Sequence, residues 1–420
     1  MAYNRKQRLN DNIKAIETAF ILDREQRTPT ARERLLLERY CGFGGLKCIL
    51  NPARELADAV HWAKSDLELF APTVELHRLI RENSKNESEY KQLMDSLKQS
   101  VLTAFYTPSA VTEALTDVLK EHQIIPEKVL EPSAGIGAFV DSVLDNNPKT
   151  DIMAFEKDLL TGKILRHLHP EQKVRIEGFE KIEKPFNDYF DLAISNIPFD
   201  VAVFDPSYTA MKGMRALVTR RIHNYFFVKA LDTVRDGGLV AFITSQGVLN
   251  AKNNSAARFM MLYHADLVSA IRLPNNLFTE NANTEVGSDL IILQKNSQKE
   301  SLRGDDNLLD TVYNDENRIP TNNYFLEHPE RIIHTTAKLD TDPFGKPAMI
   351  YTHEDGVEGI AEDLRKMLHE DFKKNLNLNR YLGIEETKAE EVKEVEETEK
   401  IEETEKIKPS IEVKQNDTVV

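Results

Sequence analysis

Residues 128–139 read KVLEPSAGIGAF, and this segment decides the fold. A short apolar run typical of a buried strand leads into a glutamate, a proline and small residues, and a helical pattern follows. Gly135 and Gly137 suit a tight turn, because a residue without a Cβ allows the backbone to approach a ligand closely. In an open parallel sheet, ligands bind beyond the carboxyl ends of the strands. The segment therefore predicts a strand, a ligand-binding turn and a helix, with an ordinary strand-to-helix turn as the alternative.

Apolar runs of strand length recur along the chain after this segment. They lie at 151–155, 174–176, 191–194, 239–244, 267–271 and 289–293. Helical patterns separate the first five of the seven runs, which predicts a mainly parallel sheet with helices on both faces. No helix separates the last two runs, and they therefore predict an antiparallel pair at one end of the sheet.

The whole chain divides into four predicted regions. These are a helical N-terminal region (1–100), the sheet domain (101–295), a mixed C-terminal extension (296–384) with one clear helical stretch at 356–375, and an acidic disordered tail (385–420). Within the first region, residues 42–45 read GFGG and resemble a cofactor loop, but they follow a helical run at 32–40 and no strand. A helix terminator and turn is the better interpretation.

The acidic tail carries much of the net charge. The chain has 54 Lys and Arg against 69 Asp and Glu, a formal net charge of −15. Residues 385–420 contain thirteen acidic residues and six lysines, a balance of −7, with a tandem EETEKI repeat at 396–407. Such a composition buries too little apolar surface to offset the entropy lost on ordering, although a single exposed helix with Glu–Lys pairs is the alternative. The negative total therefore does not exclude a nucleic-acid partner for the folded body.

The remaining composition predicts a folded cytoplasmic protein. Hydrophobic residues make up 41% of the chain and charged residues 29%. No stretch approaches the roughly 18 apolar residues of a membrane-spanning helix, and the first residues lack the apolar core of a signal peptide. Cys41 and Cys48 are too few for a disulfide framework, and no histidine pair stands beside them at ligand spacing. We therefore expect no membrane association and no metal.

Acidic and aromatic residues follow the second and third predicted strands. The second strand ends in Phe155 and Glu156, where an acidic side chain can accept hydrogen bonds from both hydroxyls of a ribose. The third is followed by Phe179 and Glu180, where a carboxylate can meet an adenine amino group and an aromatic ring can face the base. These positions predict a nucleoside site, with a solvated loop carboxylate as the alternative for Glu180.

The fourth predicted strand ends in residues 195–199, which read SNIPF. The side-chain carbonyl of Asn196 and the main-chain carbonyl of Ile197 can accept the two hydrogens of a planar amine, which concentrates lone-pair density on its nitrogen. Pro198 fixes the turn. Phe199 offers a stacking face, worth roughly 1–3 kcal/mol to a base. The turn therefore predicts a site where an amine is held for attack on an electrophile, and positioning of this kind can supply most of a barrier reduction.

These motifs together resemble a known family, the amino-methyltransferases of DNA. The resemblance covers residues 101 to about 295 and rests on FYTP (105–108), LEPSAGIGAF (130–139), FEKD (155–158) and SNIPF (195–199), in this order. With GFGGL (42–46) and RLPNNLF (272–278), the chain is also similar to the methylase portions of large methylase–helicase proteins of bacterial mobile elements. The resemblance implies a Rossmann-like fold dependent on S-adenosylmethionine, with a mainly parallel seven-stranded sheet, and adenine-specific DNA methylation of the restriction-modification kind.

The resemblance also implies which residues bind which partner. The residues expected at the cofactor, S-adenosylmethionine, are Tyr106, Thr107, Pro108, Glu131, Pro132, Ser133, Gly135, Gly137, Glu156 and Glu180. The first three pack over its methionine part, the next five surround its amino-acid end, and Glu156 holds the ribose. The residues expected at the target adenine are Asn196, Ile197, Pro198 and Phe199. The implied partners are DNA and a helicase or restriction-type polypeptide.

The chain departs from the family pattern in two places. The usual catalytic tetrad is Asn-Pro-Pro-aromatic, and Ile197 stands where the first proline is expected. Because the group used there is a main-chain carbonyl, the substitution keeps the acceptor and loses rigidity. Members that read a specific sequence carry a long recognition region after the core, and about 90 residues stand here between the core and the tail. An RNA or protein-glutamine methyltransferase, or an inactive partner subunit, are the alternative functions.

Two other segments imitate the tetrad. Residues 205–208 read DPSY and resemble its acidic variant, and residues 342–344 read DPF. Neither follows a clear fourth strand, so both are interpreted as decoys.

Basic residues gather shortly after the predicted catalytic turn. Lys212, Arg215, Arg220, Arg221 and His223 lie within a dozen residues and suit a loop that contacts DNA phosphates, with a solvated helix face as the alternative. A polar loop containing Asn275, Asn276 and residues 281–284 is a further candidate lining of the substrate cleft.

Overall fold

The computed structural model describes residues 4–103, 106–199, 203–210, 213–279, 285–302, 306–313, 318–342 and 345–384. Met1–Leu376 form one compact unit and Asn377–Val420 a second. The acidic tail, predicted to be disordered at 385–420, lies outside the described residues. No helix of the described chain is both long enough and apolar enough to cross a membrane.

The first hundred residues form helices, as predicted. Apolar residues of the first helix recur at helical spacing and are buried in a shared core, among them Leu9, Ile13, Ile16 and Phe20. The side chain of Thr30 caps the second helix together with Glu33. The elements are α1 (Arg5–Glu25), α2 (Ala31–Leu37), η1 (Lys47–Leu50), η2 (Leu56–His61), η3 (Lys64–Leu69), α3 (Phe70–Glu82) and α4 (Glu87–Thr103).

The GFGG segment is a turn, as predicted, but it does not terminate the helix, because α2 ends at Leu37 with Glu38 as its C-cap. Gly42 and Gly45 adopt positive φ angles of 67° and 76°, which glycine reaches without strain. The Asn12 amide donates to the carbonyl of Gly42 at 2.6 Å, and Phe43 is fully buried in the helical core. The segment therefore fixes the chain after α2.

A seven-stranded sheet forms the centre of the molecule, in the order β3-β2-β1-β4-β5-β7-β6. Only β7 runs antiparallel to its neighbours, and it pairs with β5 and β6, so the mainly parallel α/β fold with an antiparallel pair at one end is confirmed. The strands are β1 (Lys128–Glu131), β2 (Asp151–Phe155), β3 (Lys173–Arg175), β4 (Phe190–Asn196), β5 (Val234–Ser245), β6 (Ala265–Leu273) and β7 (Ser288–Lys295).

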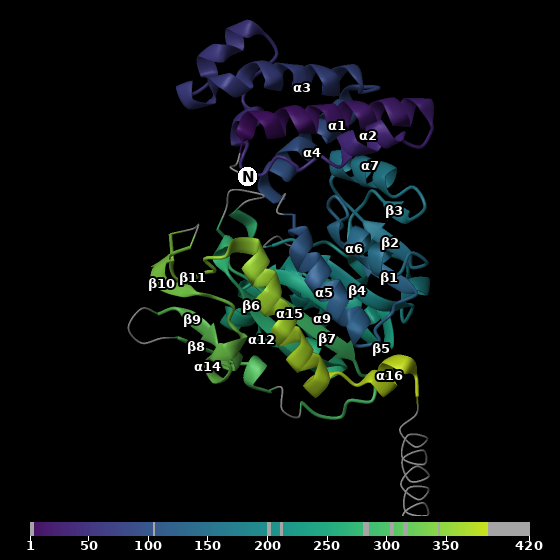
Figure 1. The fold of residues 1–420 in the computed structure, drawn as a ribbon, viewed down its shortest axis with the longest axis vertical. Helices are drawn as coiled ribbons and strands as arrows, with labels where there is room; N and C mark the ends of the chain where they lie inside the picture. Colours follow the sequence, from purple (N-terminus) through teal and green to yellow (C-terminus); the bar gives the residue numbers. More distant parts are fainter. Residues whose placement is uncertain are drawn as a thin grey trace, which may run out of the picture. The chain divides into compact units, whose positions relative to one another are not determined.

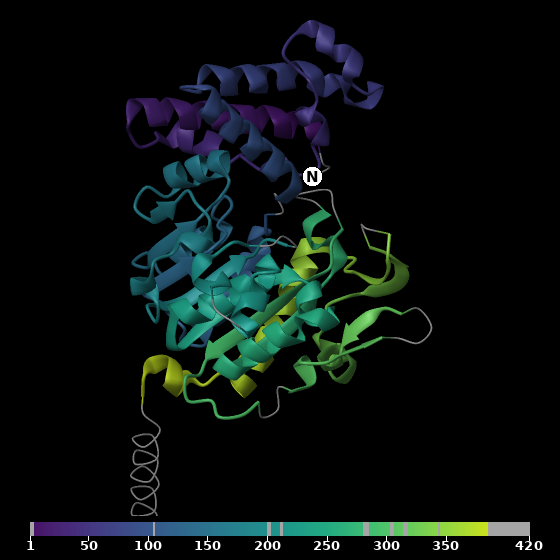
Figure 2. The same cartoon turned by 180° about the vertical axis from the view of Figure 1, so that it is seen from behind.

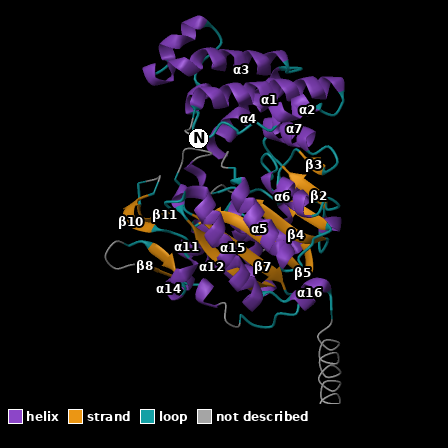
Figure 3. Ribbon diagram, in the orientation of Figure 1, coloured by secondary structure: helices purple, strands orange, loops and turns teal. Residues whose placement is uncertain are grey.

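Helices cover both faces of this sheet, as predicted (Figure 3). α5 (Ser109–Glu121), α6 (Ala138–Asn146) and α15 (Gly356–Asn375) lie on one face, and α15 packs along both α5 and β6 (Figure 1). α10 (Ile222–Thr233) and α12 (Ser255–His264) cover the other face (Figure 2). The remaining elements between the strands are α7 (Leu159–Leu168), η4 (Phe179–Lys181), η5 (Lys184–Phe186), α8 (Pro206–Thr209), α9 (Met214–Val218), α11 (Gly247–Asn250), η6 (Lys252–Asn254) and η7 (Asn275–Phe278).

The N-terminal helices share their core with α7, a helix of the sheet domain. Leu160, Ile164 and Leu168 of α7 belong to the same buried cluster as the apolar residues of α1–α4. On the surface of this contact, Asp23 of α1 pairs with Lys163, with Arg166 at 3.0 Å and with His167 at 2.8 Å. The helical region and the sheet domain are therefore joined by one hydrophobic core.

The C-terminal extension adds two short hairpins and a long helix. Its elements before the helix are η8 (Asp306–Leu308), β8 (Thr311–Tyr313), β9 (Pro320–Asn322), α14 (Asn323–Glu327), η9 (Pro329–Arg331), β10 (Thr336–Thr341) and β11 (Pro347–Thr352). The helical stretch predicted at 356–375 is confirmed as α15. In the second unit, α16 (Leu378–Leu382) starts at the capping side chain of Asn377 and ends at Gly383 with a φ of 68°.

Candidate active site

The ends of three neighbouring strands meet at one edge of the sheet. Because β2, β1 and β4 are parallel and adjacent, their carboxyl ends place Glu156, Glu131 and Asn196 along the same edge. Hydrogen bonds tie the three strand ends together: Ala134 N–H donates to the Phe155 carbonyl at 2.8 Å, and Ser195 Oγ to the Ser133 carbonyl at 3.3 Å. The motifs predicted separately from the sequence therefore lie at one edge.

The turn after β1 depends on its two glycines. Gly135 and Gly137 have φ angles of 56° and 92°, in the left-handed region. A Cβ at position 135 would lie 2.8 Å from the ring of Tyr106, and a Cβ at 137 would lie 2.7 Å from Nε2 of His169. The absence of a Cβ therefore lets the Tyr106 ring pack against Gly135 and the His169 ring pack against Gly137. No sequence motif had indicated His169.

Four carboxyl groups lie in and around this turn. Burial raises the pKa of Glu131 well above its ordinary value, and the charges of Glu156 and Asp141 raise it further. Burial, then the charge of Asp158, raises the pKa of Glu156 to about 8, against hydrogen bonds from three main-chain amides. Burial likewise raises the pKa of Asp158, and that of Asp141 to about 6. The cluster would be stabilised by a cationic ligand.

Two buried oxygen atoms at this edge have no hydrogen-bond partner among the described residues. They are Oε2 of Glu131, whose residue is 2% exposed, and Oγ1 of Thr107, whose residue is 6% exposed. Native proteins seldom leave such atoms unsatisfied, and unpartnered buried polar groups are frequent at binding sites. Both atoms belong to segments predicted to bind the cofactor.

The N-terminal helices supply part of the wall around the site. Ser96 Oγ of α4 donates to Asp158 at 2.6 Å and accepts the N–H of Leu160 at 3.0 Å. The hydroxyl of Tyr40 lies 3.2 Å from Oγ1 of Thr161 on α7, and that of Tyr106 lies 3.5 Å from the same atom. Ser96 and Tyr40 carry no sequence signal, because their partners lie about 60 and 120 residues away along the chain. Phe105 lies outside the described residues.

The two residues after the third strand lie in different surroundings. Phe179 is 1% exposed, and its ring contacts Phe155, Tyr225 and Phe226 with centroids 5.2–6.3 Å apart. The expectation that this ring faces a base is therefore wrong, because it is core packing. Glu180 is half-buried beside Gly178, and its assignment to the cofactor stays a prediction.

The turn predicted to be catalytic begins at the last residue of β4, Asn196, which is half-buried. The main-chain N–H of Ile197 donates to the Ile243 carbonyl of β5 at 2.9 Å, and its side chain is 1% exposed within the main core. A proline at this position has no N–H and could not make this bond. The expected loss of rigidity is thus offset, because Ile197 anchors the turn through β5 and the core. Pro198 and Phe199 are half-buried.

The nearby decoy is structural. Asp205 is 3% exposed, and its carboxylate accepts hydrogen bonds from Ser207 N–H at 2.8 Å and from Tyr225 Oη at 2.7 Å. Tyr208 is buried in the main core, where its hydroxyl donates to Asp232. Asp342 belongs to the turn between β10 and β11, and its two following residues lie outside the described ones. Asp205 and Tyr208 therefore serve the fold.

The basic segment is smaller than the sequence suggested. Arg215 forms a bidentate ion pair with Asp232 at 2.6 and 3.0 Å. Burial lowers the pKa of His223 to about 4, so this side chain is neutral at pH 7. Lys212 lies outside the described residues. Arg220 and Arg221 are the two members of the group that line a polar cavity of about 340 Å³ between α9, α10 and α12.

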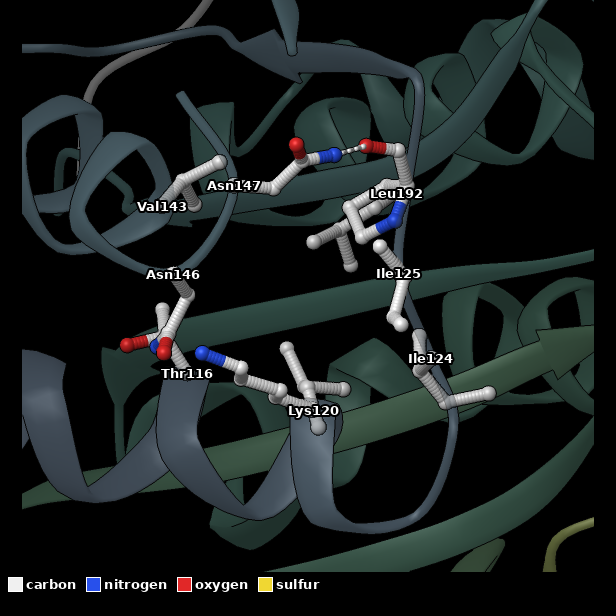
Figure 4. Close-up of a pocket in the computed structure, with 10 residues that line it drawn as sticks. Thr116, Lys120, Ile124, Ile125, Val143, Asn146, Asn147 and Leu192 are labelled. Atoms are coloured by element: carbon white, nitrogen blue, oxygen red, sulfur yellow. Dashed lines mark hydrogen bonds between the residues drawn. The ribbon is translucent and has the colours of Figure 1, made fainter. Parts of the chain in front are cut away.

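A second pocket, shown in Figure 4, lies elsewhere in the fold. It has a volume of about 20 Å³, room for about one water molecule, and is lined by α5, α6 and residues before β1. It therefore lies at the amino end of β1, away from the edge where the motifs meet.

The asparagines after β6 hold the extension in place. Oδ1 of Asn275 accepts the N–H of Tyr351 at 3.0 Å, and Asn276 exchanges two hydrogen bonds with the main chain of His353, at 3.0 and 3.1 Å. These bonds hold the end of β11 and the residue after it, and the expected role of the two asparagines in lining a cleft stays a prediction. Residues 281–284 lie outside the described ones. Among the residues with described side chains, no group of three His, Cys, Asp or Glu is placed to hold a metal ion.

A family model for N-6 DNA methylases matches residues 88–390, which is well over half of the chain. The chain belongs to this N-6 DNA methylase family. The match includes the sheet domain, α4 of the helical region and the extension up to residue 390. The resemblance drawn from the motifs is therefore confirmed, and the mainly parallel sheet is that of a Rossmann-like S-adenosylmethionine-dependent methyltransferase.

Two curated relatives share part of this methylase. One is the "Defense against restriction protein B" of Escherichia phage P1, 28% identical over 201 residues, which are 46% of this chain and 8% of the relative. The other is the "Type II methyltransferase M.XamI" of Xanthomonas campestris pv. amaranthicola, 24% identical over 173 residues, 38% of this chain and 33% of the relative. The chain thus spans a small part of the first relative and a third of the second.

Among solved structures, the methylase is similar to the type I restriction-modification methyltransferase subunit of Streptococcus thermophilus. The two share 14% sequence identity with a TM-score of 0.42, over 90% of this chain and 93% of the other.

Proposed function

We propose that this methylase transfers a methyl group from S-adenosylmethionine to the N6 amine of adenine in DNA. The observation that carries the proposal is the shared edge of β2, β1 and β4, where Glu156, the turn of Gly135 and Gly137, and Asn196 lie side by side. Family membership supports it independently, through residues 88–390.

The residues at this edge fit the cofactor. When bound, S-adenosylmethionine supplies a methyl group on a positively charged sulfur. The unpartnered oxygens of Glu131 and Thr107 offer acceptors for its polar groups, and a cationic ligand would favour ionisation of the buried carboxyl groups, whose pKa values burial raises. We assign Glu156 to the ribose, Glu131, Pro132, Ser133, Gly135 and Gly137 to the amino-acid end, Tyr106, Thr107 and Pro108 to the methionine part, and Glu180 to the adenine.

The target amine is assigned to the turn after β4. Oδ1 of Asn196 and the main-chain carbonyl of Ile197 accept its two hydrogens, Pro198 fixes the turn, and Phe199 stacks on the base. A bound S-adenosylmethionine would supply its methyl group to N6 and become the neutral thioether, and the amine would release one proton to solvent. An asparagine amide is no base at neutral pH, so Asn196 orients the amine and takes no proton.

DNA is the proposed substrate class. The base must leave the duplex to reach this turn, because N6 cannot be attacked within the stack. Arg220 and Arg221 are assigned to the phosphates, where charge gives affinity without sequence preference. A helicase or restriction-type partner belongs to the same proposal, and the name of one relative, "Defense against restriction protein B", refers to restriction. Free Cys41 and Cys48 suit a cytoplasmic enzyme.

The test is methyl transfer from labelled cofactor to unmethylated double-stranded DNA, to RNA and to protein extract. We expect N6-methyladenine in DNA alone, and its loss in the Asn196→Ala variant with cofactor affinity retained. Transfer to RNA or to glutamine would replace the proposed substrate, and cofactor binding without transfer to any of the three would indicate an inactive partner subunit.

A further inference from the structure

An aromatic side chain stands in solvent a short distance along the chain from the catalytic turn. Phe204 is 75% exposed, eight residues after Asn196. Burying such a ring is favourable, and a solvated phenylalanine is therefore a candidate contact for another molecule.

The backbone around Phe204 is held on both sides. Val203 packs against the main core, and its N–H donates to the carbonyl of Thr219 at 2.9 Å. Asp205 is buried, where its carboxylate caps α8 and accepts the hydroxyl of Tyr225. Because both neighbours are fixed, Phe204 has little freedom to move into the core, and its exposure is set by the fold.

The surroundings of this residue match a nucleic acid. Two more apolar side chains of the same segment are exposed, Met214 at 44% and Leu217 at 40%. The bond from Val203 to Thr219 brings Phe204 close to Arg220, which lines the polar cavity together with Arg221 and Leu217. Apolar groups close to a positive charge suit a DNA duplex, whose stacked bases and phosphates lie side by side.

We propose that Phe204 enters the DNA base stack and fills the space that the extruded adenine leaves. This inference rests on the proposed function, since it applies only if adenine in a duplex is the substrate. Extruding a base costs stacking and pairing free energy, and an apolar wedge between base steps offsets part of that cost.

The experiment compares Phe204→Ala with the wild type on two duplexes. The methylated sequence is first mapped by sequencing plasmid DNA treated with the wild-type enzyme. One duplex then pairs the target adenine with thymine, and the other has an abasic position opposite it, which lowers the cost of extrusion. We expect kcat/KM of Phe204→Ala to fall about tenfold or more on the paired duplex and to recover largely on the abasic one. Cofactor affinity should stay unchanged.

Two further variants separate the wedge from a general surface effect. Phe204→Leu, which keeps an apolar side chain, should retain most activity on the paired duplex. Leu326→Ala removes another exposed apolar side chain, which is 56% exposed on α14. This variant should leave kcat/KM unchanged on both duplexes. Equal losses of Phe204→Ala on both duplexes, no loss at all, or a loss seen only when a partner polypeptide is present would each overturn the inference. If the wild type methylates no DNA, the proposed function is wrong, and this inference falls together with it.

Discussion

The main-chain N–H of Gly135 donates a hydrogen bond of 2.8 Å to Oε2 of Glu156. Oε1 of the same carboxyl group accepts the N–H of Asp158 at 2.7 Å. The group that we assign to the ribose is therefore fixed by the turn after β1 and by its own loop before any ligand binds. A preorganised acceptor of this kind loses less entropy on binding than a mobile one.

The first prediction concerns this turn. Gly135→Ala would place a Cβ 2.8 Å from the Tyr106 ring, and we expect cofactor affinity to fall at least about tenfold because Tyr106 must move. Gly345→Ala is the matched control, since Gly345 has a similar φ of 78° but nothing within 4 Å of the added Cβ. Calorimetric titration with S-adenosylmethionine measures both. Equal affinity in the two variants would show that Tyr106 and Gly135 are not at the cofactor.

The second prediction concerns pH. Burial raises the pKa of Glu156 from its ordinary 4.5 to about 8, so the folded protein keeps a proton that the unfolded chain loses. Stability of the unliganded protein should therefore fall as pH rises from about 4.5 to 8 and then level off. A cationic ligand favours the carboxylate, so cofactor affinity should rise with pH in the same window, by at most about tenfold per unit.

Glu156→Gln is the control for this pH dependence, because it keeps the shape and cannot titrate. Calorimetry from pH 6 to 8 in two buffers of different ionisation enthalpy reports protons released on binding. The wild type should release protons, and the variant fewer. Identical proton release in both would remove Glu156 from the cofactor site.

The third prediction tests the amine-holding turn. Asn196→Ala should reduce methyl transfer by orders of magnitude and leave cofactor affinity close to wild type, and Phe199→Ala should act in the same way more mildly. Asp205→Asn should change the melting temperature more than the rate, because Asp205 accepts hydrogen bonds within the fold. An active Asn196→Ala variant beside an inactive Asp205→Asn variant would reverse the assignment of turn and decoy.

The fourth prediction concerns Ile197. Ile197→Pro restores the residue usual in the family, yet it removes the N–H that bonds the Ile243 carbonyl and leaves that carbonyl unsatisfied. We expect the free energy of unfolding to fall by about 1–3 kcal/mol, with no gain in rate. Ile197→Val keeps the N–H and should lose less stability. A faster or more stable proline variant would show that the bond to β5 contributes nothing.

The fifth prediction separates the arginines by salt dependence. Changing Arg220 and Arg221 to glutamine should weaken DNA binding and reduce the slope of log affinity against log salt by about 1 for each phosphate that is no longer neutralised. Arg215→Gln should lower stability and leave the slope unchanged, because its charge is paired with Asp232. Fluorescence anisotropy with duplex DNA between 50 and 200 mM salt, a range of about fourfold, gives the slopes.

Local patterns predicted the sheet and the order of the motifs, because strand ends and glycine turns are written in consecutive residues. The residues that hold those motifs in place by hydrogen bonds could not be predicted in this way. Ile243, which anchors Ile197, lies 46 residues farther along the chain, and Ser96 reaches Asp158 across 62 residues. Such pairs become neighbours only when the sheet and the helical core have formed.

The role of Arg215 was not predictable for a related reason. A count of charges along the sequence cannot show that Arg215 is neutralised by Asp232, one helix later. The same holds for Asn275, whose amide resembles a cleft-lining group in sequence and in the fold binds a strand of the extension. A polar side chain can bind a ligand or another part of the chain, and only the tertiary structure shows which of the two it binds.

The core shared by α1–α4 and α7 limits how such a gene can recombine. Leu160, Ile164 and Leu168 of α7 pack against the apolar residues of α1–α4, while Asp158, the N-cap of α7, donates its main-chain N–H to Glu156, which we assign to the ribose. A crossover between two relatives anywhere from residue 104 to 158 would join one parent's helices to the other parent's α7. In such hybrids the residues of α7 would pack poorly against the helices of the other parent. We therefore expect the N-terminal helices to be exchangeable only together with α7.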